Sequence, residues 1–339
     1  MPVYYLTKNS WKRLLSCLKE IYDTYVLKES NGKLSYHLLG DEDTSTYDEI
    51  IYNKIRAVQP IKSFFQVFAE NVSKTVKKTR KRIIIGVKAC DINALEALDK
   101  MFLEGEYVDE FYKEKRDNTI LIGCDCTMPD NNCFCTVLGN NPFIEKGVDL
   151  TLAQVHDGFV IQSDSDKGQG LIDENRNIFG GEIKENLNEE RDKLRKNTTN
   201  AVKSINEKFN LKPQFWKNLS KYYDSNAWKK ESETCVECHG CTNVCPSCYC
   251  FLLADLPGRK EFNRMKYQDS CQSSGYARVA GGATPRPELF ERFRNKYMCK
   301  FDYRLNTIGL VSCTGCGRCI DACQGDIDIR KVVTAVLKR

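Results

Sequence analysis

The chain has 339 residues, of which 41% are hydrophobic, and its formal net charge is +5. That length allows one to three domains with a sizeable core. No apolar run approaches the roughly 20 residues that a membrane-spanning helix needs. The mild charge and a basic run over 74–82 without interleaved aromatic residues argue against nucleic-acid binding, and we assign this run to the solvated end of a helix. Eighteen cysteines without an export signal predict a reducing, cytoplasmic location in which thiolates bind metals.

The first two thirds of the chain alternate predicted helices and strands. Apolar spacing predicts a helix over 10–29 that buries Cys17, a short strand over 33–39 and a helix over 64–78. A continuous apolar strand, Arg82–Val87, precedes a helix, Ile92–Phe102, which Asp91 can cap. The later elements are a short helix, Asp109–Arg116, a buried strand, Thr119–Gly123, and two antiparallel strands, Val148–Val155 and Gly158–Gln162. This order predicts an α/β domain with a mostly parallel sheet over 1–228.

Four cysteines follow the ends of two buried strands in this domain. Cys90 and Cys126 come directly after strands, and Cys133 and Cys135 lie close behind. Because the carboxyl ends of parallel strands meet at one edge of a sheet, we expect these thiols to converge there. We predict a [4Fe–4S] cluster on these four cysteines, with Cys124 as a possible substitute for Cys126. Buried thiols, redox-active thiols and a zinc site remain alternatives.

Two regular cysteine runs lie in the last third of the chain. The first is Cys235-x2-Cys238-x2-Cys241-x3-Cys245-Pro, the spacing with which ferredoxin-type domains hold [4Fe–4S] clusters. The second run is Cys313, Cys316, Cys319 and Cys323. The fourth cysteine of such a run ligates the other cluster. The predicted ligand sets are therefore crossed: Cys235, Cys238, Cys241 and Cys323 for the first cluster, and Cys313, Cys316, Cys319 and Cys245 for the second.

Zinc and disulfides are the rival interpretations of these runs. A structural zinc site needs only four ligands, and disulfides suit small secreted domains. We expect residues 229–339 to form a mainly α-helical, dicluster ferredoxin-like domain with an insertion over 246–312. A helix is predicted over Glu288–Lys300. Four of the arginines in this part are expected to face solvent or an acidic partner: Arg286, Arg292, Arg294 and Arg304.

The insertion carries further cysteines, among them Cys248, Cys250 and Cys271. They are packed thiols, extra ligands or a redox thiol set. The chain has no G-x-G-x-x-G after a strand, no G-x-x-x-x-G-K and only three histidines, so nucleotide binding and His-based catalysis are poorly supported. The cysteines predict an electron-transfer subunit with no complete active site of its own. A thiol or disulfide reductase using Cys248, Cys250 and Cys271 is the main alternative function, and a zinc-dependent scaffold is a third.

These motifs together resemble one known family. Gly86-Val87-Lys88-Ala89-Cys90-Asp91, then Cys133-Phe-Cys135, both cysteine runs and the segment from Cys271 to Arg286-Pro287 are similar to the iron–sulfur beta subunit of cytoplasmic NiFe sulfhydrogenases. The A subunit of anaerobic sulfite reductase is related. The chain departs from the family pattern at Gln324, at Ser273-Ser274 and at Cys124.

The resemblance implies a relay between two partner subunits. One would be a flavoprotein linked to NAD(P)H or ferredoxin. The other would be a catalytic subunit of NiFe hydrogenase or sirohaem reductase type. The resemblance also places Cys90, Cys126, Cys133 and Cys135 in the family's N-terminal cysteine set.

Overall fold

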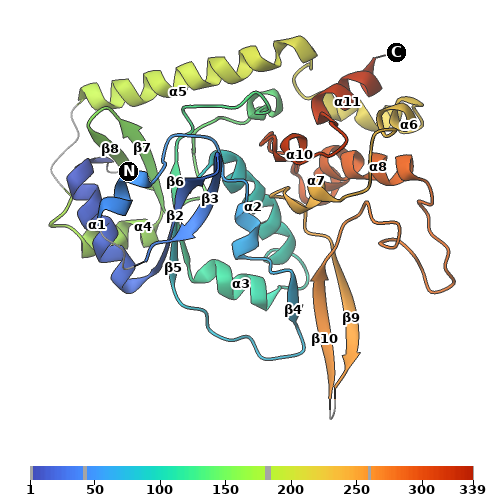
Figure 1. Ribbon diagram of the computed structural model, residues 1–339, viewed down its shortest axis with the longest axis horizontal. Helices are drawn as coiled ribbons and strands as arrows, with labels where there is room; N and C mark the ends of the chain where they lie inside the picture. The colour runs from blue at the N-terminus through green and yellow to red at the C-terminus, as the bar shows by residue number, and fades with distance from the viewer. Residues whose placement is uncertain (1–2, 41–43, 180–184, 259–260, 339) are drawn as a thin grey trace.

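The computed structural model describes residues 3–40, 44–179, 185–258 and 261–338. Its larger part is built on a seven-stranded sheet (Figure 1). In spatial order the strands are β1 (Val3–Thr7), β8 (Gly158–Ser163), β7 (Leu150–Val155), β6 (Thr119–Cys124), β5 (Arg82–Val87), β2 (Asp23–Ser30) and β3 (Lys33–Leu38). The four central strands are parallel, while β1, β8 and β3 are antiparallel to their neighbours. The α/β class is thus confirmed, with a mixed sheet.

Helices cover both faces of this sheet. α1 (Lys8–Ile21) and α4 (Asp166–Glu174) pack on one face with Ile83, Ile85 and Ile122. α2 (Ala89–Phe102) and α3 (Glu110–Asp117) pack on the other with Ile84 and Leu121. Because β5 and β6 send alternate residues into two cores, they read in the sequence as continuous apolar runs.

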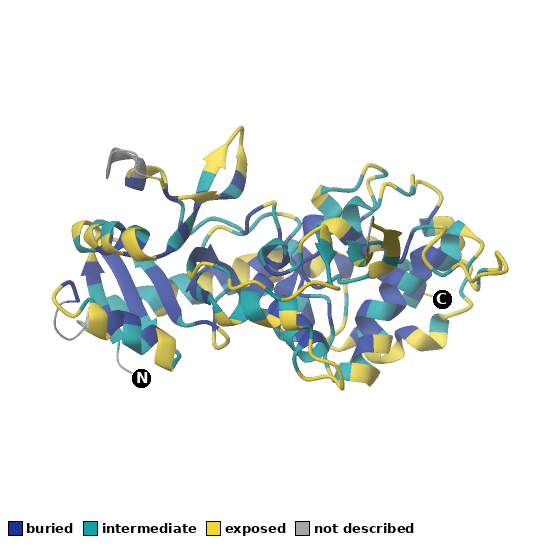
Figure 2. Cartoon of the chain, turned by 90° about the horizontal axis from the view of Figure 1, so that it is seen from below, coloured by how far each residue is buried: buried dark blue, intermediate teal, exposed yellow. Residues whose placement is uncertain are grey.

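The remaining helices join and form the second part of the molecule. α5 (Glu185–Asn206) runs from the sheet toward it (Figure 1). The second part holds α6 (Ala227–Glu231), α7 (Gly240–Asn243), α8 (Leu289–Met298), α9 (Arg304–Ile308), α10 (Arg318–Asp321) and α11 (Ile329–Leu337). A π-helical turn, Cys299–Tyr303, joins α8 to α9. The core of this second part includes Trp228, Phe293 and Val332. Figure 2 shows this second buried region beside that of the sheet.

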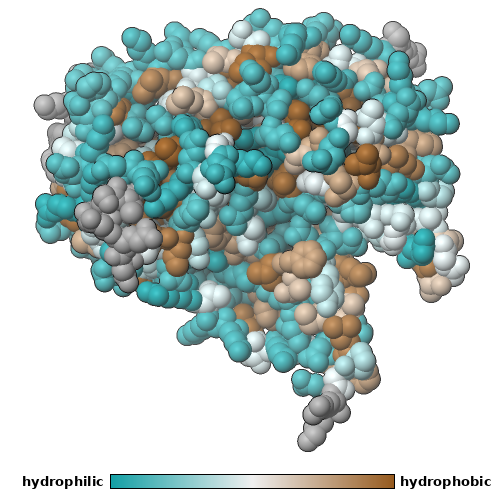
Figure 3. All heavy atoms as spheres, in the orientation of Figure 1, coloured by the Kyte–Doolittle hydropathy of each residue, from teal (hydrophilic) through white to brown (hydrophobic). Residues whose placement is uncertain are grey.

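A hairpin projects from the body of the molecule. β9 (Phe251–Pro257) pairs with β10 (Phe262–Gln268), and β10 also pairs with β4 (Ala69–Asn71) from the first part of the chain. Apolar side chains such as Leu252 and Phe262 are exposed on it, and Figure 3 shows this apolar colouring along the projection. Among the described residues, no helix is long and apolar enough to cross a membrane.

Most predicted elements of the sheet are confirmed, but one predicted helix is too long and another is wrong. The helix expected over 10–29 ends at Ile21, because the following residues form β2 and pair with β5 and β3. Its cap is Thr7, whose hydroxyl accepts from Ser10 N at 3.1 Å, and Cys17 is exposed rather than buried. The helix expected over 64–78 is replaced by a short 3-10 turn, by β4 and by an irregular basic segment. Pairing with the distant β10 overrides the helical spacing there.

Candidate metal centres

The first thiol set lines one cavity. Cys235, Cys238, Cys241 and Cys323 surround it together with Cys319. The Cys235–Cys241 loop turns tightly because Glu237 and His239 adopt left-handed conformations, with φ of 51° and 60°. Gly240 packs against the loop that carries Cys323, since a Cβ there would lie 3.1 Å from Ala322 O. The structure therefore brings the fourth cysteine of the second run to the thiols of the first.

The second thiol set lies on a glycine-containing loop. Cys313, Cys316 and Cys319 are separated by Gly315 and Gly317, whose φ values of 70° and 77° are strained for other residues. Burial is the largest cause that raises the pKa of Cys319, and the neighbouring Cys316, Cys313 and Cys245 sulfurs raise it further. Cys245 thus lies near enough to the second run to act electrostatically on Cys319.

The third thiol set lines a second cavity at the carboxyl edge of the sheet. Cys90, Cys126, Cys133 and Cys135 surround it together with Cys316. Cys90 lies in the first turn of α2, Cys126 follows β6, and Cys135 begins a 3-10 turn. Cys124 instead packs in the core between the sheet and α1. The geometry therefore favours Cys126 over Cys124 for this set.

The three sets are neighbours, with the second in the middle. Cys319 reaches the first cavity and Cys316 reaches the third. A Cβ on Gly315 would lie 2.4 Å from Cys135 N, so the loop of the second set touches that of the third. Glycine is required at this position by the close backbone approach as well as by its φ.

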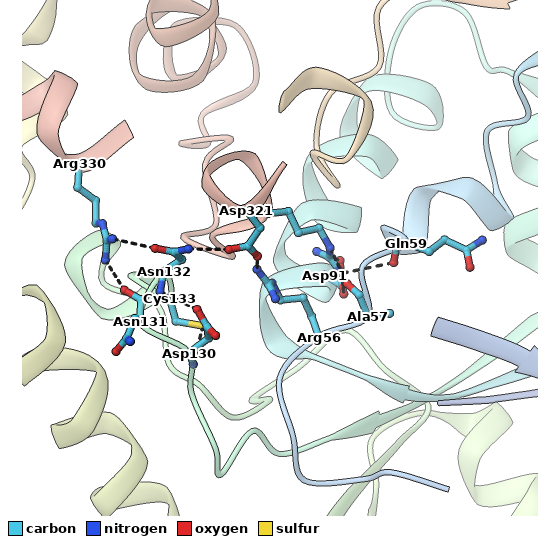
Figure 4. Close-up of polar contacts among 11 residues, drawn as sticks. Arg56, Ala57, Gln59, Asp91, Asp130, Asn131, Asn132, Cys133, Asp321 and Arg330 are labelled. Atoms are coloured by element: carbon cyan, nitrogen blue, oxygen red, sulfur yellow. Dashed lines mark hydrogen bonds and ion pairs between the residues drawn. The ribbon is translucent and has the colours of Figure 1, made fainter. Parts of the chain in front are cut away.

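Paired charges lock the loops of the second and third sets together. Arg318 follows Gly317, and its guanidinium donates to both carboxylate oxygens of Asp91, each at 2.8 Å. Asp91 follows Cys90 and is fully buried, so it pairs with Arg318 rather than capping α2, whose N-cap is Lys88. Figure 4 shows Arg56 beside Asp321, in the same region. This network joins the sheet to the second part of the chain.

Further contacts position the loop that carries Cys133, a member of the third set. Asn132 Nδ2 donates to Asp321 Oδ1 at 2.6 Å, and Arg330 donates to Asn131 O at 2.8 Å (Figure 4). Asp130 N donates to Cys133 Sγ at 3.4 Å. The loop that carries Cys133 is therefore positioned by α10 and α11.

Buried cations surround the thiols. Lys300 Nζ lies 2.9 Å from Cys245 Sγ and 3.4 Å from Cys248 Sγ, and Lys296 Nζ lies 3.6 Å from Cys241 Sγ. Burial alone would lower the pKa of Lys300, but the Cys245 and Cys248 sulfurs raise it overall. Lys62 and Arg304 are also buried nearby, with backbone carbonyls as their hydrogen-bond acceptors.

These cations provide a test of whether the sites fit iron–sulfur clusters. Within the described parts of the chain, none of the four forms an ion pair with a carboxylate. A buried unpaired charge is costly, and burial lowers the pKa of Lys62 accordingly, whereas neighbouring sulfurs supply the negative charge that raises the pKa of Lys296, Lys300 and Arg304. Burial raises the pKa of Cys133, Cys135 and Cys313 to about 12, hence their thiols ionise readily only on binding metal. All-thiolate clusters, which are anionic, fit this environment.

The arrangement of the sulfurs also suits a multi-iron group. No three His, Cys, Asp or Glu side chains in the described residues converge on a single metal ion. The thiols of the first and third sets instead surround cavities, as ligands to different iron atoms of one cluster must. Backbone amides donate to their sulfurs, for example Ile327 N to Cys323 Sγ at 3.3 Å. Such bonds set cluster potentials.

The insertion differs from its prediction in two respects. Arg292, Arg294 and Arg304 are buried rather than facing solvent; Arg292, for example, bonds Glu237, and Arg304 lies 4.0 Å from the centre of the Tyr249 ring. Cys299, which carries no spacing signal, lies near Cys271. Of the other insertion thiols, Cys248 lies beside the second set, because Lys300 Nζ contacts both its sulfur and that of Cys245. Cys250 and Cys271 hydrogen-bond to each other.

Comparison with known proteins identifies the class of protein to which this chain belongs. The family model of the 4Fe-4S dicluster domain matches residues 234–327, so [4Fe–4S] clusters are cofactors of this chain. The chain is 34% identical over 329 residues to sulfhydrogenase 2 subunit beta of Pyrococcus furiosus, which covers 94% of this chain and 93% of that relative. It therefore belongs to the sulfhydrogenase beta-subunit family, which its cysteine motifs already resembled. It is an iron–sulfur electron-transfer subunit.

A second relative shares a shorter stretch. F420-dependent formate dehydrogenase subunit beta of Methanocaldococcus jannaschii is 27% identical over 114 residues, which is 33% of this chain and 23% of that relative. Both relatives are subunits named beta.

Proposed function

We propose that this chain is the single-electron relay of a multi-subunit oxidoreductase and that it holds three [4Fe–4S] clusters. The ligands would be Cys235, Cys238, Cys241 and Cys323 for the first, Cys313, Cys316, Cys319 and Cys245 for the second, and Cys90, Cys126, Cys133 and Cys135 for the third. A bound cluster accepts one electron and passes it on. The observation that carries this proposal is the position of the second set, which contributes Cys319 to one neighbouring cavity and Cys316 to the other.

The chain's own residues would orient and tune these centres. Lys296 and Lys300 lie beside Cys241 and Cys245, where their charge favours the more negative, reduced state. His239 supports the first loop through its left-handed backbone. Gln324, exposed beside Cys323, leaves the ligands intact.

The partners we propose are a flavoprotein linked to NAD(P)H or ferredoxin and a catalytic subunit. The name of the Pyrococcus relative favours a NiFe hydrogenase over a sirohaem reductase for the latter. We further propose the cytoplasm as the location, because eighteen cysteines serve metals best in a reducing compartment. We also propose a domain boundary near residue 228, with residues 229–339 as the dicluster domain.

Metal analysis of the anaerobically purified chain tests the cluster assignment. Three clusters require about twelve irons and about twelve acid-labile sulfides per chain, four of each per cluster. About eight of each would remove the third cluster, and zinc in place of iron would overturn the proposal. Identification of the co-purifying chains distinguishes a hydrogenase large subunit from a sirohaem subunit.

A further inference from the structure

Cys250 and Cys271 lie at the two ends of the hairpin base. Cys250 directly precedes β9, and Cys271 follows β10. The last strand pair joins Phe251 to Gln268, and Asp269 N then donates to Cys250 O at 2.9 Å. The backbone pairing of the hairpin therefore fixes the distance between these two cysteines.

Their sulfurs contact each other. The Cys271 thiol hydrogen-bonds to Cys250, and the Tyr276 hydroxyl donates to the same sulfur. The bond from Cys271, with help from Tyr276 and Arg304, lowers the pKa of Cys250 to about 6, whereas the same bond and burial raise the pKa of Cys271. One thiolate beside one thiol is the arrangement of reactive dithiols.

This pair differs from the proposed ligands of the first and third sets, although Cys245 of the second set also hydrogen-bonds to a neighbouring thiol, Cys248. The sulfurs of the first and third sets surround cavities, whereas those of Cys250 and Cys271 hydrogen-bond directly. The pair nevertheless adjoins the second set through Cys248. Lys300 Nζ contacts the sulfurs of both Cys245 and Cys248, and the Cys248 sulfur acts electrostatically on Cys271.

We propose that Cys250 and Cys271 form an internal dithiol–disulfide couple that stores two electrons beside the second thiol set. This inference rests on the proposed function, because the electrons arrive singly from the Cys245 side. Reduction breaks the Cys250–Cys271 S–S bond. It consumes two electrons and one proton, which leaves the Cys250 thiolate and the Cys271 thiol. Oxidation returns both electrons and that proton and forms the bond again.

The test uses the full chain with its iron, poised anaerobically over a range of potentials with redox mediators. Samples are quenched in acid, unfolded and alkylated, and the Cys250 and Cys271 peptides are quantified by mass spectrometry. We expect the two residues to lose alkylation together as the potential rises, with a two-electron Nernst slope. Alkylation of exposed Cys17 should not change.

Single variants make the assignment specific. Cys250→Ser should leave Cys271 alkylated at every potential, and Cys271→Ser should do the same for Cys250, with the iron content unchanged in both. Alkylation of both thiols at all potentials in an iron-replete chain overturns the couple. Loss of iron in Cys250→Ser also overturns it, because Cys250 would then be a cluster ligand. A chain that forms the disulfide but holds no iron contradicts the proposed relay and leaves the couple standing.

Discussion

The two parts of the molecule present thiols in different ways. In the second part, short loops with left-handed residues such as Glu237 and Gly315 carry three closely spaced cysteines of each run. In the first part, Cys90 and Cys126 are delivered by the ends of separate strands, β5 and β6, and Cys133 and Cys135 by a following loop. The cysteines on the loops can be recognised from their spacing in the sequence, whereas those at the strand ends come together only through the topology of the sheet. Thiols can therefore be gathered either by local sequence or by tertiary structure.

The largest expected effect is the loss of one cluster from the sheet region. Cys126→Ser should lower the iron content by about a third, because one of the three proposed four-iron clusters loses a thiolate. Cys124→Ser is the matched control, since that sulfur packs in the core and not in the cavity. Iron analysis with electron paramagnetic resonance compares the two. A reversed pattern would exchange these two cysteines in the assignment.

Breaking the ion pair between the two regions should have the next largest effect. Arg318→Ala leaves Asp91 buried without its partner, which costs about 3–5 kcal/mol. Thermal unfolding of the anaerobic holoprotein should show a clearly lower midpoint. Arg264→Ala breaks the exposed pair with Asp255 on the hairpin and should change the midpoint little. Equal shifts would mean that the Arg318–Asp91 pair does not hold the regions together.

Gly315→Ala should weaken the contact between the loops of the second and third sets. The new Cβ would meet Cys135 N at 2.4 Å, in addition to a left-handed cost of roughly 1–2 kcal/mol. Gly309→Ala carries the same backbone cost, with φ of 73°, but its Cβ meets open space. Iron retention during mild chelation should therefore fall for Gly315→Ala and stay near wild type for Gly309→Ala. Equal retention in the two variants would argue against a tight contact there.

Removing a counter-charge should have the smallest effect. Lys300→Met should lower the midpoint potential of the second cluster by on the order of 100 mV, because a buried cation no longer stabilises its reduced form. Lys193→Met, on an exposed position of α5, should leave all potentials unchanged. Potentiometric titration followed by electron paramagnetic resonance measures both. An unchanged potential in Lys300→Met would show that water or another cation replaces the lysine.

Local patterns predicted much of the fold but not its long-range pairings. Arg82–Val87 and Thr119–Gly123 were recognisable as buried strands because both faces are covered. The β9–β10 hairpin and its partner β4 were missed, since 64–78 carries helical spacing and pairs with residues almost 200 positions away. The converging positions of Cys90 and Cys126 could be inferred from strand ends. The position of Cys299 near Cys271 could not be inferred, because the turn after α8 brings it there and no cysteine spacing in the sequence indicates it.

Buried cations were the other feature that sequence reasoning missed. Arg292, Arg294 and Arg304 read as a solvated face, since arginine is usually exposed. Their burial follows from neighbours that appear only in three dimensions, such as Glu237 for Arg292 and the Tyr249 ring for Arg304. This basic helix and its extension therefore bury their cations, and Lys296 and Lys300 are the ones that contact the sulfurs of Cys241 and Cys245.

Lys296 and Lys300 lie four residues apart on one continuous helical run, and each contacts a sulfur of a different proposed cluster. Four residues of helix rise about 6 Å. Electron tunnelling rates fall steeply with distance, so the spacing between two redox centres must hold steady during turnover. The end of α8, with its π-helical extension, would keep the first and second proposed centres at a constant separation.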